Sequence, residues 1–69
     1  MDRESRAILE RALKEMEDGE SFERALGRII RKEKGDYRRY VDIIGEVREF
    51  AYARHIDALE AARRIAGSR

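Results

Sequence analysis

Residues 19–36, GESFERALGRIIRKEKGD, decide the fold class of this 69-residue chain. Ser21 is a strong N-cap residue, and the apolar residues after it recur at the three-and-four spacing of one helix face. Acidic residues open the segment and basic residues close it, which matches the helix dipole. Gly19 and Gly35 flank it, as glycines often do at helix ends. The stretch predicts a helix over 22–34.

The same signals predict a helix on its N-terminal side, over 6–18. Ser5 is its expected N-cap, and Gly19 is its expected end because glycine enters the left-handed conformation at little cost. The apolar residues between them share one helix face; they are Ile8, Leu9, Ala12, Leu13 and Met16.

Asp36 is expected to cap a long third helix over 37–54. Its apolar seam has the spacings 3, 4, 3 and 4, which are typical of a helix that packs along a partner. We expect this seam to form an interface; it consists of Tyr37, Tyr40, Ile44, Val47 and Ala51, and it is broadened by Val41, Ile43 and Phe50. Gly45 would weaken this helix by about 1 kcal/mol relative to Ala unless another segment packs closely there.

A short fourth helix is predicted over 58–66. Asp57 and Glu60 resemble a capping box at its start. The alternative is that the third helix continues unbroken through His55, and we favour the break.

Together these segments predict an all-α fold in one domain, a small three-to-four-helix bundle with a helical hairpin, a long third helix and a short C-terminal helix. Strand signals are nearly absent, since the chain has no Thr and no sustained alternation of apolar residues. A chain of this length buries only about 60% of the surface that it exposes when unfolded. We therefore expect a homodimer.

The composition excludes several function classes. The absence of Cys excludes disulfides, cysteine zinc sites and thiol catalysis. No apolar run approaches the ~18 residues of a membrane span, so we expect a cytoplasmic protein. Charged residues make up 45% of the chain, and Asn, Gln and Cys are missing, which is typical of thermophilic proteins. We expect no cofactor and no metal.

A basic cluster is a candidate for nucleic-acid contact, although the net charge of the whole chain is only +1. The cluster consists of Arg28, Arg31, Lys32, Arg38 and Arg39, and the nearby tyrosines could stack on bases. Residues 47–67 could also be a helix-turn-helix pair, but this region has no Asn, Gln or Thr to read a base edge, and we interpret it as a plain helical hairpin.

No catalytic group stands out in the sequence. Arg48 and His55, seven residues apart, echo the arginine–histidine motif of small helical ribonucleases of the HEPN group. Such a pair could stabilise phosphate charge and move a proton. We interpret His55, the single histidine, as the end of a helix, and we expect the protein not to be an enzyme.

Residues 5–36, SRAILERALKEMEDGESFERALGRIIRKEKGD, resemble the small archaeal antitoxins of the VapB type. The matching positions are Gly19, Glu20, Ser21 and Phe22, then Leu26, Ile29 and Ile30, and finally Lys34, Gly35 and Asp36. Members of that family pair with PIN-domain ribonuclease toxins. They begin with a strand that reads DNA, but residues 1–4 here are not strand-like, so we expect no such ribbon.

The sequence thus favours a helical regulatory protein that resembles an antitoxin. Residues 5–34 would dimerise, and residues from about 37 onward would bind a partner ribonuclease toxin. The alternative is a structural helical-bundle module of a thermophile with no nucleic-acid or catalytic role.

Overall fold

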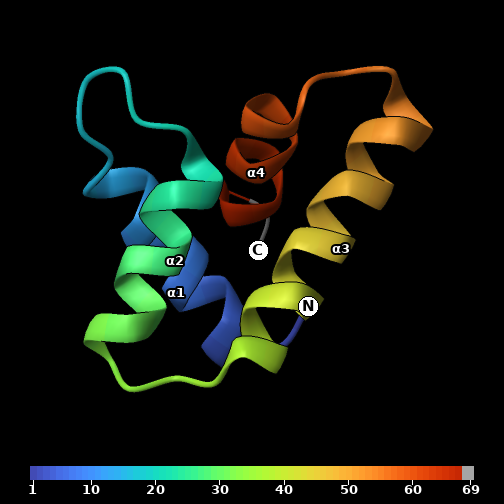
Figure 1. The fold of residues 1–69 in the computed structure, drawn as a ribbon. Helices are drawn as coiled ribbons and strands as arrows, with labels where there is room; N and C mark the ends of the chain where they lie inside the picture. The colour runs from blue at the N-terminus through green and yellow to red at the C-terminus, as the bar shows by residue number, and fades with distance from the viewer. Residues whose placement is uncertain (68–69) are drawn as a thin grey trace.

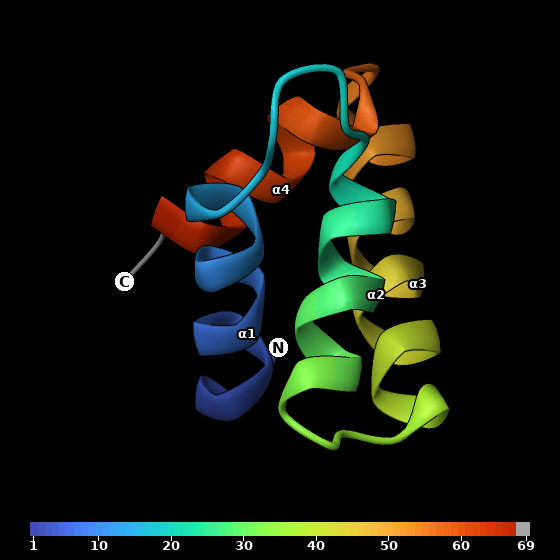
Figure 2. The same cartoon turned by 60° about the vertical axis from the view of Figure 1, so that its left-hand side comes forward.

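The computed structural model describes residues 1–67 and confirms the all-α fold. These residues form four helices and no strand: α1 (Arg3–Lys14), α2 (Phe22–Lys32), α3 (Tyr37–Arg54) and α4 (Ala58–Gly67). α1 packs most extensively against α2, α3 lies beside α2, and α4 packs on both α3 and α1 (Figure 1). Figure 2 shows α4 running across α1 at the end of the hairpin.

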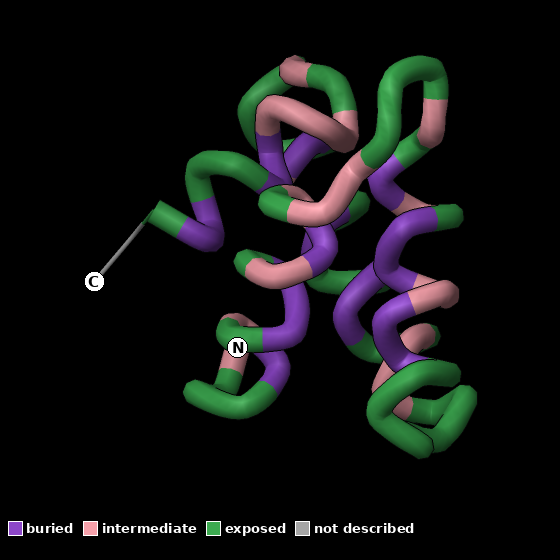
Figure 3. The backbone as a smooth tube through the Cα atoms, turned by 90° about the vertical axis from the view of Figure 1, so that its left-hand side faces the viewer, coloured by how far each residue is buried: buried purple, intermediate pink, exposed green. Residues whose placement is uncertain are grey.

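The apolar faces of the four helices meet in one core. Figure 3 shows that the buried residues lie on the inner sides of the helices. The largest side chains that are fully buried are Leu9, Leu26, Ile29, Ile43 and Val47. Full burial of a side chain of this size stabilises a fold by about 1.5–3 kcal/mol, so these residues are the main contributors to the packing of the helices.

Three of the predicted N-caps are formed, each by a side-chain oxygen that accepts the backbone N–H three residues further along. They are Ser21 to Arg24 at 3.3 Å, Asp36 to Arg39 at 2.9 Å, and Asp57 to Glu60 at 2.8 Å. Each cap satisfies one of the N–H groups that a helix start leaves without an intrahelical partner. As a result, α2, α3 and α4 begin where the sequence predicts.

The bounds of the first helix correct the prediction of 6–18. α1 begins at Arg3 because Asp2, and not Ser5, is its N-cap; the Asp2 carboxylate accepts the Ser5 N–H at 2.7 Å. The helix ends at Lys14, and the backbone carbonyl of Glu15 accepts a hydrogen bond from Arg28 at 3.0 Å. Gly19, with a φ of 80°, lies in the turn that follows and not at the helix end.

The second helix ends two residues earlier than predicted, at Lys32. Lys34 takes the left-handed conformation with a φ of 57°, and the Gly35 N–H reaches back to the Ile30 carbonyl at 2.8 Å. This is a Schellman arrangement in which lysine occupies the position usually taken by glycine. Gly35 instead allows the chain to pass close to Ile30, since a Cβ at position 35 would lie 3.2 Å from Cγ2 of Ile30.

The break between the third and fourth helices is present at His55. This residue has a φ of 55°, and the Ile56 N–H bonds to the Ala51 carbonyl at 3.1 Å. α3 therefore has the predicted range, and α4 extends one residue past the predicted end, to Gly67.

Candidate interaction surfaces

The interface predicted on α3 is divided between the core and the surface. Ile44, Val47 and Ala51 are buried in the core of the chain itself. Tyr40 is half-buried, whereas Tyr37 is 76% exposed. Because α2 and α4 of the same chain pack on α3, the five residues do not form one surface that a second chain could cover. The predicted seam is thus corrected to a mainly intramolecular one.

Another side of α3 carries an exposed face. Val41, Gly45 and Tyr52 lie four and seven residues apart, so they share one side of the helix. Val41 is 47% exposed and Tyr52 is 85% exposed, although both are large apolar or aromatic side chains. We call these three residues, together with Arg38 and Glu49 beside them, the outer face of α3.

Gly45 lies at the middle of the outer face and has no steric role among the residues that the structure describes. A Cβ atom at this position would meet no neighbouring atom within 4 Å, and the residue has no positive φ. Gly27 differs, because a Cβ there would lie 3.6 Å from the Tyr40 ring. A glycine inside a helix costs about 1 kcal/mol relative to alanine. The folded chain alone gives no reason for this cost at position 45.

The outer face includes two opposite charges. Arg38 and Glu49 are both exposed, and neither forms an ion pair with another residue of the described chain. They are eleven residues apart, which is about three full turns of an α-helix. They therefore lie on nearly the same line along α3, on either side of Gly45.

Arg28, the first member of the predicted basic cluster, has a structural role. Its guanidinium bonds to both carboxylate oxygens of Glu20, at 2.9 and 3.3 Å, and to the Glu15 carbonyl. The side chain of Glu20 is only 12% exposed. The hydrogen bond from Arg28 lowers the pKa of Glu20 below its ordinary value, and the backbone N–H of Glu17 adds to this effect. This pair fixes the turn between α1 and α2.

Arg39, another predicted contact, joins α3 to the start of α1. It donates to the Ser5 hydroxyl at 3.0 Å and to the Glu4 carboxylate at 3.1 Å. It also lies 3.8 Å from the Asp2 carboxylate. The pKa of Asp2 is lowered mainly by its backbone hydrogen bond with Ser5, and Arg39 contributes less. The charge of Arg39 is thus largely neutralised by carboxylates of the same chain.

The other three members of the predicted cluster remain available. Arg31, Lys32 and Arg38 are exposed and have no ion-pair partner within residues 1–67. The structure therefore separates the five cations into two that hold the fold together and three that face solvent.

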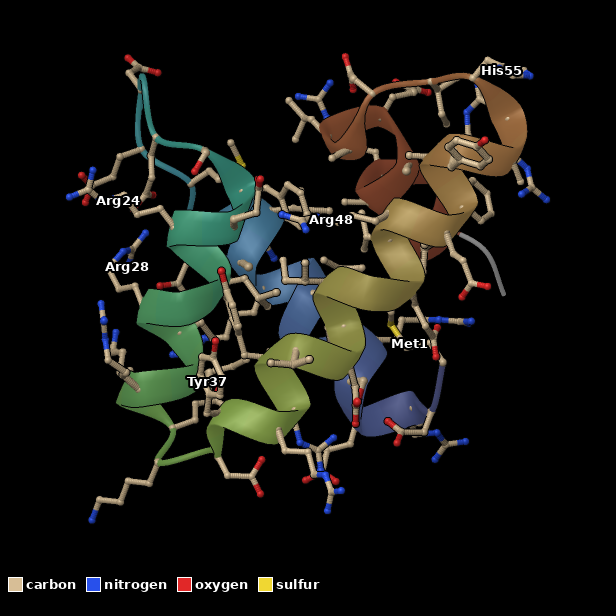
Figure 4. The ribbon with its side chains drawn as sticks, turned by 45° about the vertical axis from the view of Figure 1, so that its right-hand side comes forward. Met1, Arg24, Arg28, Tyr37, Arg48 and His55 are labelled. Carbon is tan, nitrogen blue, oxygen red and sulfur yellow. The ribbon has the colours of Figure 1, made fainter. Side chains whose placement is uncertain are left out.

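A shallow groove between α2 and the start of α3 brings exposed cations beside aromatic rings. The rings of Tyr37 and Tyr40 are stacked, with centroids 5.8 Å apart and planes 23° apart. Arg24 and Arg31 line the same hollow, whose volume is about 690 Å³. Figure 4 shows Arg24 on α2 and Tyr37 between the lower ends of α2 and α3. We call this site the tyrosine groove.

A second hollow, of about 730 Å³, lies beside α3 and is lined by Met1, Phe50 and Arg54 among others. Most of its charged groups are engaged within the chain, although Glu49 also lines it. The Arg54 guanidinium lies 3.7 Å from the centre of the Phe50 ring, and the amino group of Met1 is 3.2 Å from Glu46. This hollow offers a ligand fewer uncommitted charges than the tyrosine groove does.

Arg48 and His55 are not brought together as a catalytic pair. Figure 4 shows Arg48 on the side of α3 that borders α2, while His55 lies at the far end of the helix. His55 is exposed and occupies the left-handed position that ends α3. Among the described residues, no group of three or more acidic or histidine side chains is placed to hold a metal ion. No helix of the described part has the length and apolar character needed to cross a membrane.

Comparison of the chain with family models, curated proteins and solved structures finds no match. The two surfaces therefore rest on their own geometry. The sequence contains the signal for the outer face, since Val41, Gly45 and Tyr52 follow the same helical spacing as the buried seam. Arg24 was not among the candidate contact residues, because it lies N-terminal to the dense run of basic residues.

Proposed function

We propose that this protein is a non-enzymatic helical interaction protein that forms a homodimer through the outer face of α3. The observation that carries this proposal is Gly45, an exposed helical glycine at which a Cβ would meet no atom of residues 1–67 within 4 Å. Glycine permits the close approach of another backbone or side chain. Val41 and Tyr52 on the same face would gain burial in such a contact, and each is already held on a rigid helix.

A second copy of the chain fits this face when the two α3 helices run antiparallel. A two-fold axis near residue 43 places Val41 of one copy over Gly45 of the other, and the reverse. In the same register Arg38 of each copy faces Glu49 of the other, because both residues lie on one line along the helix. Two charge pairs then form from residues that have no ion-pair partner within residues 1–67 of one copy, so the face is complementary to itself.

The size of this contact indicates a weak dimer. α3 has 18 residues and is therefore about 27 Å long. An interface of one helix per copy lies at the small end of specific interfaces, which is below about 1,200 Å² in total. We expect association that depends on concentration and that is lost on dilution.

Sedimentation equilibrium of three proteins tests the proposal. The wild type should show a monomer–dimer equilibrium, whereas Val41→Asp should remain monomeric because it buries an unpaired charge. Ala7→Asp is the control, since Ala7 is exposed on α1 and away from the outer face. This control adds the same charge and should associate as the wild type does. A monomeric wild type at high concentration, or equal association of all three proteins, would disprove the interface.

The regulatory part of the proposal is that the protein acts on a partner ribonuclease toxin, as antitoxins do, and it is supported by the resemblance of residues 5–36 alone. Residues 37–67 fold onto the first two helices, so a partner would meet a folded surface and not an extended tail. Co-expression with a PIN-domain nuclease encoded beside the gene tests this role. Relief of growth arrest supports it, and continued arrest with no complex on size-exclusion chromatography contradicts it.

A further inference from the structure

The tyrosine groove contains an aromatic platform that the dimer does not use. Tyr40 is half-buried, and its ring packs beside Gly27, where a Cβ would lie only 3.6 Å away. Tyr37 stacks on this anchored ring and is itself 76% exposed. Stacking on Tyr40 thus fixes Tyr37 in the groove while much of its surface remains open to solvent. A flat, uncovered aromatic surface of this kind is suited to stacking with another planar group.

Two arginines of α2 line the groove beside this platform. Arg24 and Arg31 are seven residues apart, so they lie on one side of α2 and about 10.5 Å apart along its axis. Both are exposed, and neither is paired with a carboxylate of the described chain. Glu23 is the single acidic residue that lines the groove, so the lining carries a net positive charge.

Two neighbouring arginines differ from Arg24 and Arg31 because they do form ion pairs. Arg28, which lies one turn after Arg24 on α2, and Arg39 on α3 are both held by carboxylates. Arg28 and Arg39 are therefore neutralised within the chain, while Arg24 and Arg31, which line the groove, have no carboxylate partner among the described residues. Unpaired arginines beside an exposed aromatic ring indicate an anionic ligand with a planar part.

The shape of the groove matches such a ligand. Its volume of about 690 Å³ lies within the range of about 300–1,000 Å³ that is usual for ligand sites. The lining includes Gly27 and Gly35, which have no side chains to fill it, and Ile30 supplies an apolar floor. A stacking platform with cations at its side is the arrangement by which proteins bind single-stranded nucleic acid.

We propose that the tyrosine groove binds single-stranded nucleic acid, with a base stacked on Tyr37 and phosphates beside Arg24 and Arg31. A duplex does not fit this chemistry, because its bases are already stacked on one another. An acidic peptide would satisfy the arginines but would leave the aromatic platform without a planar partner. The residues that line the groove include no Asn, Gln, Ser or Thr, and the arginines are assigned to phosphates, so we expect binding with little sequence preference.

Fluorescence anisotropy with a labelled 12-nucleotide oligo(dT) probe at low salt tests the proposal on the full chain. The wild type should bind, and Tyr37→Ala should weaken binding by about 5-fold to 150-fold, which is the loss measured for one stacked base. Tyr37→Phe keeps the ring and should bind as the wild type does. Tyr37 is exposed at the surface, so helicity measured by circular dichroism should be equal in all three proteins.

Salt dependence tests the phosphate contacts separately. The slope of log affinity against log salt concentration should fall by about 0.7 for each arginine replaced, first in Arg24→Gln and then in Arg24→Gln with Arg31→Gln. Arg63→Gln is the matched control, because Arg63 is an exposed residue of α4 that does not line the groove. It removes the same charge and should leave the slope unchanged.

Three results would overturn the proposal. One is the absence of binding to the oligonucleotide at low salt. Another is equal loss of affinity in Arg63→Gln, which would indicate attraction to the net charge and no built site. The third is displacement of the probe by a poly-glutamate peptide together with wild-type affinity in Tyr37→Ala, which would identify an acidic protein segment as the occupant. Arg24, Arg31 and Tyr37 lie outside the outer face, so these substitutions leave the residues of the proposed dimer contact unchanged.

Discussion

Replacement of Gly45 by alanine should have opposite effects on the stability of the single chain and on its association. Gly45 is in the middle of α3, has no positive φ, and has open space where a Cβ would lie. An alanine at such a position stabilises a helix by about 1 kcal/mol relative to glycine. For a domain of this size, that change raises the melting temperature by about 4–8 °C.

The same substitution should weaken association of the dimer. In the proposed antiparallel pair, Val41 of each copy packs on Gly45 of the other, so one substitution introduces two methyl groups at the two-fold axis. Overpacking of a close contact typically costs about 1–3 kcal/mol, which weakens association by about 5-fold to 150-fold. Gly45→Ala should therefore unfold at a higher temperature as a monomer and dimerise less tightly.

Two measurements separate these effects. Denaturation followed by circular dichroism at a concentration below the dimer dissociation constant reports the stability of the monomer, and sedimentation equilibrium reports association. Ala53→Gly is the matched control, because Ala53 is exposed on α3 but is not part of the outer face. It should lower stability by about 1 kcal/mol and leave association unchanged. If Gly45→Ala gains stability and associates as tightly as the wild type, the role given to Gly45 in the dimer is wrong.

Three further predictions concern the fold. The lowered pKa of Glu20 means that its pair with Arg28 stabilises the protein above the ordinary value of 4.5 and that this contribution is lost as the pH falls through the lowered pKa. Urea denaturation should thus show a smaller difference between the wild type and Glu20→Gln at pH 3 than at pH 7, and an equal difference would contradict the pair. His55→Gly should be more stable than His55→Ala by about 1 kcal/mol in thermal unfolding, because glycine relieves the left-handed strain and alanine does not. Leu26→Ala should cost about 2–5 kcal/mol by the same measurement, since the side chain is fully buried, and a smaller loss would indicate a loosely packed core.

Much of the helical pattern could be predicted from short-range signals. Ser21, Asp36 and Asp57 each cap the helix that the sequence assigns to them, because capping depends on residues only three positions apart. The first helix was misplaced because two capping residues, Asp2 and Ser5, compete at its start. The Ser5 hydroxyl instead binds Arg39 from the third helix, which is a contact 34 residues away that local signals do not contain.

The periodicity of the apolar seam on α3 could not predict which helices cover it. The spacing of Ile44, Val47 and Ala51 indicates a buried side of a helix, but it does not indicate whether the covering helix belongs to the same chain. In the structure, α2 and α4 cover this side. The buried seam therefore no longer supports the dimer that the short length of the chain led us to expect. The case for self-association now depends on Gly45 and the exposed Val41 and Tyr52.

The two proposed surfaces act together in the dimer. The tyrosine groove lies at the start of α3, whereas the proposed two-fold axis passes near residue 43. Six residues separate Tyr37 from this axis, so the antiparallel dimer places its two platforms about 18 Å apart along the helix axis. One strand could then contact both grooves, and the second contact would be intramolecular with a high effective concentration. Dimerisation through an otherwise weak interface would thus raise the affinity for a strand long enough to reach both sites, without any new contact between protein and ligand.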